Sequence, residues 1–357
     1  MHGGIVMEQR YDDIGRLIEQ RVGPGRLGAG SASVIPPQRE IIRRNYTYDR
    51  NGSLISVVSS NWGRVDYIYD PAERLLKAIR EQGSSETFEY DGTGNMTHMQ
   101  MQNKISGSDE NLVYGPGNRL LQKGRTRYEY DAEGRRIKKI VEVDSGNPKV
   151  WLYQWNALDR LKAITCPDGE VWHYKYDALA RRVQKVGPRK RCHFLWDKDV
   201  IVQESTGSGA LSAWVFDTFR FSPLATVQNA RVYSVINDNL GTPKELIDSG
   251  GAVAWSAVLD CWGRTLLEKR SPGGPVCFFR FPGQYQDDEV GLYYNRWRYY
   301  DADSGQYISQ DPTGLIGGIN TYQYALDPIG SLDPFGLTGE PEGFKSFGQF
   351  KQFGEAA

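Results

Sequence analysis

The chain has 357 residues, of which 43 are basic and 44 acidic, so its formal net charge is only -1. This balance excludes a global basic field that would recruit nucleic acid. No run of 18 apolar residues predicts a membrane-spanning helix, and residues 1–17 lack the basic and apolar regions of a signal peptide.

Aromatic residues make up 12% of the chain, with 21 Tyr, and Gly accounts for 40 residues. Aromatic rings fill pleated surfaces and Gly supplies turn positions with positive φ, so this composition is typical of many short strands joined by tight turns. The four cysteines are widely spaced and form no CxxC pair. We expect buried thiols, with a disulfide as the alternative, at Cys166, Cys192, Cys261 and Cys277.

A short pattern recurs over the first 220 residues: an aromatic residue and Asp, then Gly or a small residue, a basic or polar residue and an aliphatic one. From Tyr48 onward the steps between copies range from 16 to 25 residues, which indicates a repeat architecture. The first repeat starts almost at once, so we expect that an upstream part of the protein is missing from this chain. Clear copies begin at Tyr11, Tyr48, Tyr69, Tyr90, Tyr130 and Tyr176, and weaker ones at Tyr114, Trp155, Trp196 and Phe216.

Each copy predicts a β-hairpin. The stretches before the Asp alternate in character, as half-buried strands do. The Asp can accept hydrogen bonds from backbone N–H groups two or three residues on, and the Gly can take a left-handed conformation. We therefore expect the Tyr and Asp residues to build turns and ring layers rather than to do chemistry. Stacked hairpins predict an all-β, curled antiparallel sheet that encloses space because strand twist accumulates.

Two later segments complete the pattern. One runs from Asn237 to Arg264, as NDNLGTPKELIDSGGAVAWSAVLDCWGR, and the other from Arg280 to Leu337, beginning RFPGQYQDDEVGLYYNRWRYYDADSGQYISQDPTGL. With the repeats, they resemble the Rhs family, whose YD repeats are also seen in insecticidal toxin complexes and teneurins. The resemblance covers about residues 8–337. It implies a hollow shell over residues 1–235 and a core domain that plugs it over residues 236–337.

Residues 338–357 then read as the truncated start of a variable toxin region. Four Phe residues recur there every three positions, which predicts a short C-terminal helix with its rings on one face. The helix could dock on the shell wall or open a toxin domain; twenty residues cannot form such a domain. The four residues are Phe344, Phe347, Phe350 and Phe353.

The resemblance also implies an aspartyl autoprotease that cuts after the Leu of a PxxxxDPxGL motif. Here that motif begins at Pro328, includes Asp333, Pro334 and Gly336, and places the scissile bond at Leu337–Thr338. The family's second aspartate corresponds to Asp311 and a supporting arginine to Arg298. The chain departs from many relatives at Asp327, where they carry Asn, and the effect of this extra acid is open.

Peptide hydrolysis by two carboxyl groups needs one ionised to activate water and one protonated to polarise the carbonyl. Asp311 and Asp333 are separated by the Gly-rich GLIGGIN and the strand-like TYQYAL, which would let the chain bring them together. Arg298 could hold one of them ionised through a bidentate contact. Asp-Pro followed by Gly is also common turn chemistry, so both aspartates could simply cap turns.

Other constellations are weak. The four histidines make no metal-binding pattern, and no nucleotide-binding Gly motif is present, so neither a metal nor a cofactor is predicted. The basic string PRKR at 188–191 predicts a solvated hairpin loop, with phosphate contact as the alternative. The histidines are His2, His98, His173 and His193.

The resemblance predicts the shell of a polymorphic toxin, secreted or delivered into target cells in bacterial competition. The shell would enclose its own C-terminal toxin and release it by single-turnover self-cleavage. Its partners would be that toxin segment and, through regions outside this chain, an immunity protein and delivery proteins; the shell itself would contact no nucleic acid. The alternatives are a catalytically inert shell fragment and a carbohydrate- or protein-binding repeat module.

Overall fold

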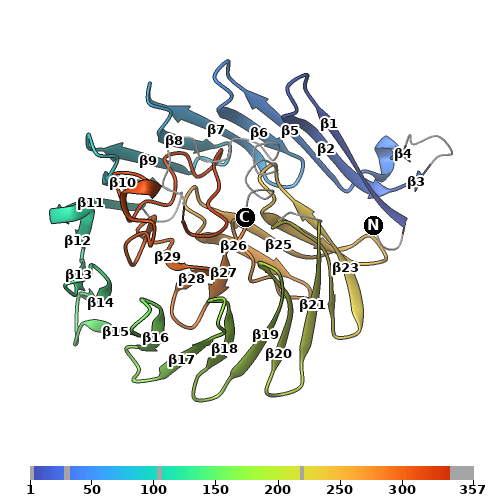
Figure 1. Ribbon diagram of the computed structural model, residues 1–357. Coiled ribbons are helices and arrows are strands. Elements are labelled where there is room, and N and C mark those ends of the chain that lie inside the picture. The colour runs from blue at the N-terminus through green and yellow to red at the C-terminus, as the bar shows by residue number, and fades with distance from the viewer. Residues whose placement is uncertain (1–3, 28–32, 103–106, 218–220, 338–357) are drawn as a thin grey trace.

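The computed structural model describes residues 4–27, 33–102, 107–217 and 221–337. Its main element is one sheet of 24 strands, in which each strand pairs antiparallel with the next along the chain (Figure 1). The strands of the first half are β1 Ile5–Tyr11, β2 Leu17–Pro24, β5 Ile42–Tyr48, β6 Leu54–Ser59, β7 Gly63–Tyr69, β8 Leu75–Arg80, β9 Ser85–Tyr90, β10 Met96–Gln102, β11 Gly107–Gly115, β12 Arg119–Lys123, β13 Thr126–Tyr130 and β14 Arg136–Val141.

The sheet continues in the same way through the second half, and we call the whole sheet the wall. The remaining strands are β15 Lys149–Trp155, β16 Leu161–Thr165, β17 Val171–Tyr176, β18 Arg182–Val186, β19 Arg191–Asp197, β20 Val200–Thr206, β21 Leu211–Phe216, β22 Pro223–Gln228, β23 Arg231–Asn237, β24 Pro243–Ile247, β25 Val253–Leu259 and β26 Thr265–Arg270.

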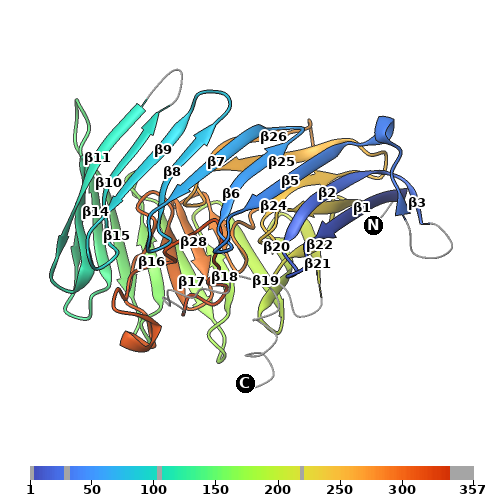
Figure 2. The same cartoon turned by 90° about the horizontal axis from the view of Figure 1, so that it is seen from above.

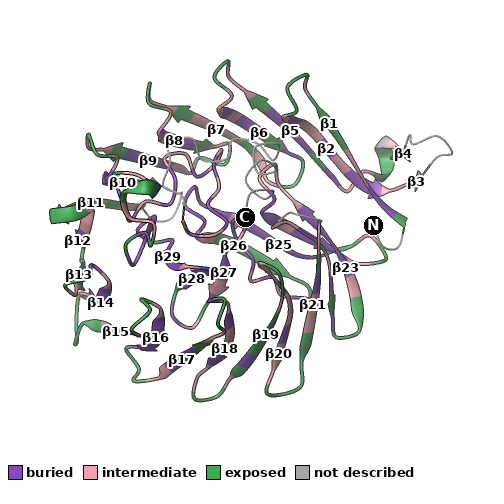
Figure 3. Cartoon of the chain, viewed as in Figure 1, coloured by how far each residue is buried: buried purple, intermediate pink, exposed green. Residues whose placement is uncertain are grey.

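A second sheet of four short strands, the plug, lies within the curve of the wall (Figures 1 and 2). Every residue of β28 and β29 is buried (Figure 3). The plug strands are β27 Tyr285–Asp287, β28 Leu292–Asn295, β29 Arg298–Asp301 and β30 Gln306–Tyr307; the other short elements are β3 Arg26–Leu27, β4 Ser33–Val34 and the 3-10 helices η2 Pro37–Arg39, η3 Pro116–Asn118 and η4 Gly314–Gly317.

The aromatic–Asp pairs form the hairpin turns of the wall, as predicted. In a typical turn the Asp70 carboxylate accepts the N–H groups of Ala72 and Arg74, both at 2.9 Å, and the Arg74 side chain at 2.6 Å. The carboxylate thus binds the amides two and four residues on, not two and three. The residue three positions after the Asp has a positive φ, as at Gly15 and Gly134. Gly suits this place because it adopts the left-handed region without steric cost.

In several pairs the tyrosine joins its hairpin to the preceding one. The hydroxyl of Tyr69 donates to the carbonyl of Leu54, and that of Tyr90 to the carbonyl of Leu75, both at 2.8 Å. The strand register shifts at each aromatic residue, for example between Ile68 and Tyr69. Such bulges bend the strand and increase its twist, so the wall is bent once in every hairpin.

The curved wall brings its first three strands, β1, β2 and β5, against β23 and β24. Ile5, Val22 and Ile42 pack with Ile236 and Ile247 in one buried cluster. Beside it, the buried guanidinium of Arg44 binds the buried carboxylate of Glu245. Residues more than 200 positions apart in the sequence therefore meet across the interior.

The wall passes through positions 235 and 236 without a break and ends only at Arg270. The core domain was predicted from the sequence to begin at residue 236. Asp238 and Asp260 form the same turn as the earlier aspartates, accepting the amides two and four residues on, so this part of the chain extends the wall. The C-terminal helix expected around Phe344–Phe353 lies outside the described residues.

Two buried ion pairs fix the plug to the wall. Arg136 Nη1 lies 2.5 Å from Asp301 Oδ2, and Arg182 binds Asp287 through two nitrogens. Each arginine directly follows a turn, at the position that Leu75 occupies in another repeat. Burial raises the pKa of Asp301, but the nearby cations Lys139 and Arg136 outweigh it and lower that pKa to about 2.

The cysteines, the basic string at 188–191 and the helices bear on three further predictions. All four cysteines are free and buried, so the disulfide alternative is wrong. The basic string forms the hairpin connection between β18 and β19, where Arg189 pairs with Glu170. Across the described ranges, no helix is long and apolar enough to cross a membrane.

Candidate self-cleavage site

The three residues singled out by the sequence come from three parts of the plug region. Arg298 opens β29, where it pairs with Asn295 at the end of β28. Asp311 follows β30 and precedes η4, and Asp333 belongs to the segment that leads to Leu337. The side chains of Arg298, Asp311 and Asp333 are each 1% exposed, so water scarcely reaches them.

Arg298 holds the two carboxylates side by side. Its Nη2 atom lies 2.9 Å from Asp311 Oδ2 and 3.2 Å from Asp333 Oδ2. Because both oxygens lie so close to one nitrogen, the carboxylates are neighbours despite their separation in sequence. The expected bidentate contact is wrong, since a single nitrogen serves both acids. The other two nitrogens donate to the carbonyls of Gly336, at 2.6 Å, and Thr321, at 3.0 Å.

Asp333 is surrounded by hydrogen-bond donors. Its Oδ2 accepts from the Tyr307 hydroxyl at 2.9 Å and from Arg298, and its Oδ1 accepts from the Leu337 amide at 2.9 Å. This is the pattern of a carboxylate acting only as acceptor. Burial and then the charge of Asp333 raise the pKa of Tyr307 well above its ordinary value, so its hydroxyl stays protonated and donates.

Asp311 has a different environment. Its Oδ1 accepts from the amide and the hydroxyl of Thr313, at 2.7 and 2.6 Å. Its Oδ2 faces Arg298, yet among the described residues it receives no hydrogen bond. Gly317 makes room for this oxygen, because a Cβ there would lie 2.6 Å from it. Asp311 Oδ2 is therefore held by the ion pair with Arg298, whereas Asp333 Oδ2 accepts hydrogen bonds from both Arg298 and Tyr307.

Both aspartates also shape turns, which was the alternative reading of the sequence. The Gly314 amide donates to the Asp311 carbonyl at 2.9 Å, and the Gly336 amide to the Asp333 carbonyl at 3.3 Å. The two readings are compatible, because each carboxylate uses one oxygen for its turn and directs the other at Arg298. A catalytic role for the three residues stays a prediction.

The rest of the motif is positioned by close backbone contacts. Gly336 has a φ of +69°, and a Cβ there would lie 2.6 Å from the Asn295 carbonyl. Pro334 lies so close to Gly283 that a Cβ on that glycine would overlap its carbonyl. Pro328 is buried and Leu337 is half-buried. Thr338, the other side of the predicted scissile bond, lies outside the described residues.

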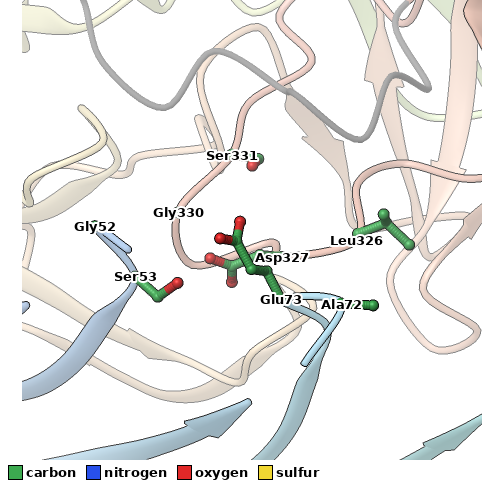
Figure 4. A pocket seen from close by; sticks show the side chains of 8 residues that line it. All are labelled: Gly52, Ser53, Ala72, Glu73, Leu326, Asp327, Gly330 and Ser331. Carbon is green, nitrogen blue, oxygen red and sulfur yellow. The ribbon is translucent and has the colours of Figure 1, made fainter. Parts of the chain in front are cut away.

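The extra acid Asp327 lies at another place. It lines a cavity of ≈ 20 Å³ between two wall turns, facing Glu73 (Figure 4). Its Oδ1 accepts the Ile329 amide at 3.0 Å. A volume of this size holds about one water molecule and no organic ligand. Asp327 therefore adds charge to a wall contact rather than to the Arg298 cluster.

Several residues that hold the site were not predicted from the sequence. Asn295 donates to the Asp333 carbonyl at 2.9 Å and to the Tyr307 hydroxyl at 2.7 Å, and Thr313 binds Asp311. Asn295 stands three residues before Arg298, the spacing of a two-residue hairpin. That spacing was the available signal, but no pattern places Tyr307 against the distant Asp333.

A long meander of aromatic–Asp hairpins curved around a buried plug defines a YD-repeat shell protein. The chain matches the family model described as the teneurin YD-shell over residues 38–327, and it belongs to that family of YD-repeat shells. The Rhs-type resemblance seen in the sequence is confirmed.

Curated relatives carry the same region within longer chains. The sequence is 33% identical to double-stranded DNA deaminase toxin A of Burkholderia cenocepacia, a match covering 94% of this chain and 25% of that protein. It is 30% identical to toxin protein Tse5 of Pseudomonas aeruginosa, covering 92% of this chain and 28% of that protein. The chain thus spans about a quarter of the length of these relatives.

Solved structures share the fold. A Photorhabdus luminescens Tc holotoxin pore matches with a TM-score of 0.65 and 18% identity, covering 95% of this chain and 18% of that one. A crystal structure of TcdB2-TccC3 matches with a TM-score of 0.64 and 18% identity, covering 93% and 19% of the two chains. The all-β shell expected from the sequence is confirmed.

Proposed function

We propose that this chain is the shell of a polymorphic toxin, which encloses its C-terminal segment and releases it by hydrolysing its own Leu337–Thr338 bond. The main support is the position of Arg298, which contacts both carboxylates and the Gly336 carbonyl, next to the predicted cut. The names of the relatives, a deaminase toxin and the toxin Tse5, support a toxin shell. Delivery into target cells and a matching immunity protein belong to the same proposal.

The hydrogen bonds favour different roles for Asp311 and Asp333 in the cleavage. Asp333 fixes the Leu337 amide and thereby holds the chain at the cut. Asp311, through the Oδ2 atom that accepts no hydrogen bond among the described residues, takes a proton from water as the water oxygen adds to the Leu337 carbonyl carbon. The same carboxyl then returns the proton to the Thr338 nitrogen as the C–N bond breaks. Arg298 stabilises the negative charge that develops beside it.

The first prediction concerns this cut. The folded wild-type protein should yield a main product ending at Leu337 and a peptide of residues 338–357. Asp311→Asn removes the proton acceptor and Asp333→Asn places an amide against the donors Arg298 and Tyr307, so both variants should stay intact. Mass spectrometry of the full chain, made by cell-free synthesis and sampled over time, measures both products.

Asp327→Asn is the matched control, because it neutralises a neighbouring acid outside the Arg298 cluster; it should be cut at the wild-type rate. A folded wild-type chain that remains intact would show an inert shell. Cleavage that persists in Asp311→Asn would refute the catalytic assignment while leaving the shell fold untouched.

A further inference from the structure

The loop that carries Asp311 rests on turns of the wall. On one side of Asp311, the Gln310 amide donates to the Glu133 carbonyl at 2.9 Å. On the other side, the Tyr322 hydroxyl donates to the Gly134 carbonyl at 2.5 Å. Both partners belong to the turn of Asp131, 177 and 188 residues earlier in the chain, so one wall turn binds both sides of the loop.

A second turn binds the middle of the loop. Asn320 Nδ2 donates to Asn95 Oδ1 at 2.8 Å, and both side chains are buried. Asn95 in turn donates to Asn118 Oδ1 at 3.0 Å, and Asn118 donates to the Ile319 carbonyl at 3.3 Å. Asn95 lies four residues after Asp91, the position that Arg74 occupies after Asp70. The shorter side chain leaves its amide oxygen available for the loop.

These anchors are connected directly to the cluster. The Asp311 amide donates to the Thr321 carbonyl at 2.9 Å, and the same carbonyl accepts from Arg298 Nη1 at 3.0 Å. Thr321 lies between the anchoring residues Asn320 and Tyr322. A shift of either wall turn would therefore move Asp311 relative to Arg298.

We propose that the wall turns at Asn95 and Gly134 position Asp311, so that the cleavage site is complete only after the wall has folded around the plug. This inference rests on the proposed self-cleavage. Asn95, Gly134, Asn320 and Tyr322 are positioning residues, since none touches the reacting bond. Cleavage before enclosure is then prevented by geometry, because an unfolded wall leaves Asp311 unplaced.

Gly134→Ala tests the inference. The new Cβ would lie 2.6 Å from the Tyr322 hydroxyl and would overlap the Gln310 amide. Gly15→Ala is the matched control, because Gly15 holds the same place in its turn with a similar φ, +84° against +79°, and its Cβ would meet no atom within 4 Å. Both variants carry the same backbone strain. A displacement of the loop by about 1 Å should slow cleavage about 10- to 100-fold in Gly134→Ala alone.

The dependence of the cleavage rate on pH separates positioning from loss of stability. Moving Asp311 away from Arg298 and Asp333 changes how the acids influence one another, so the pH profile should shift in Gly134→Ala. Destabilisation of the fold alone would lower the fraction of cleaved protein and leave the pH dependence of the cleavage rate unchanged. If Gly134→Ala does not fold, Asn320→Ala combined with Tyr322→Phe removes the anchors without strain and should give the same shift.

The outcomes distinguish the two proposals. An intact wild-type chain overturns self-cleavage and this inference together. A wild-type chain that is cut, with Gly134→Ala cut at the rate and pH profile of Gly15→Ala, overturns only the positioning role. In the fallback variant, an unchanged rate and profile overturn it equally.

Discussion

At the residue scale, Arg298 and Tyr307 explain how two acids are kept in a nearly dry interior. A buried carboxylate is costly unless it is paired and hydrogen-bonded. Arg298 supplies one cation for two acids. Its guanidinium carbon lies over the Tyr307 ring, 3.6 Å from the ring centroid. Tyr307 also donates to Asp333. The acids therefore share their support, and a change in either supporting residue reaches both.

Tyr307→Phe should slow self-cleavage while the shell stays folded. The change removes one donor from Asp333 and leaves the Asn295 amide without its hydroxyl partner, each worth about 0.5–1.5 kcal/mol. We expect about a tenfold lower cleavage rate, measured by mass spectrometry over time. Tyr300→Phe is the control, because that buried hydroxyl binds the Trp262 carbonyl, away from the cluster. Equal rates in the two variants would contradict the role given to Tyr307.

The sequence predicts the members of this cluster unevenly. Spacing alone left Asp311 and Asp333 open between catalysis and turn capping, and the family motif was needed to choose them. Their partner Tyr307 carries no signal, because its contact depends on how the segment from 326 to 333 folds back. The side-chain arrangement of Arg298 was also out of reach, since a sequence gives the charge but not which nitrogen meets which acid.

At the element scale, the turn of the aromatic–Asp hairpin is nearly self-contained. Asp49 accepts the amides of Asn51 and Ser53 at 2.9 Å, and Asn156 accepts those of Leu158 and Arg160 in the same way. An amide oxygen therefore replaces the carboxylate in this turn. Local hydrogen bonds of this kind are readable from Asp followed by Gly, which is why the hairpins could be predicted.

Asp70→Ala should lower the free energy of unfolding by about 1–3 kcal/mol, because it leaves two backbone amides and the Arg74 guanidinium without their acceptor. Asp70→Asn should cost less, since the amide oxygen can still accept both amides, as Asn156 does. Guanidinium unfolding monitored by tryptophan fluorescence measures both. Similar losses in the two variants would show that the charge, not the acceptor, stabilises the turn.

At the scale of the whole molecule, the wall and plug are joined by buried ion pairs that could not be predicted from the sequence. Arg136 and Arg182 follow Arg135 and Arg181, and an Arg–Arg pair reads as a solvated turn. Only the second arginine of each pair is fully buried. The partner acids lie in a segment 105 to 165 residues further on, so neither pair could be deduced from spacing. The continuation of the wall to Arg270 was not predicted either, because the turns at Asp238 and Asp260 are not preceded by Tyr.

Arg136→Leu should destabilise the docked plug by about 3–5 kcal/mol, because it leaves a buried acid without its main partner. Adding Asp301→Asn should recover part of that loss. The pKa of Asp301 lies below its ordinary value of 3.8, at about 2. The stability that ionised Asp301 contributes is therefore present above about pH 4 and is lost as the pH falls towards 2.

Acid unfolding curves monitored by near-ultraviolet circular dichroism measure this dependence. The wild-type unfolding free energy should fall between pH 4 and 2, and Asp301→Asn should show a smaller fall. An identical acid limb in both proteins would exclude Asp301 as a source of the pH dependence.

The tyrosine hydroxyl that reaches back to the previous hairpin has a mechanical consequence. Each such bond closes only when the earlier hairpin is already in place, as with Tyr69 on Leu54 and Tyr90 on Leu75. These bonds extend to nearest neighbours alone, whereas Arg44 with Glu245 and the plug ion pairs join distant parts of the wall. Once those long-range contacts are broken, tension from one end would separate the wall in a series of similar small steps, each releasing a single hairpin.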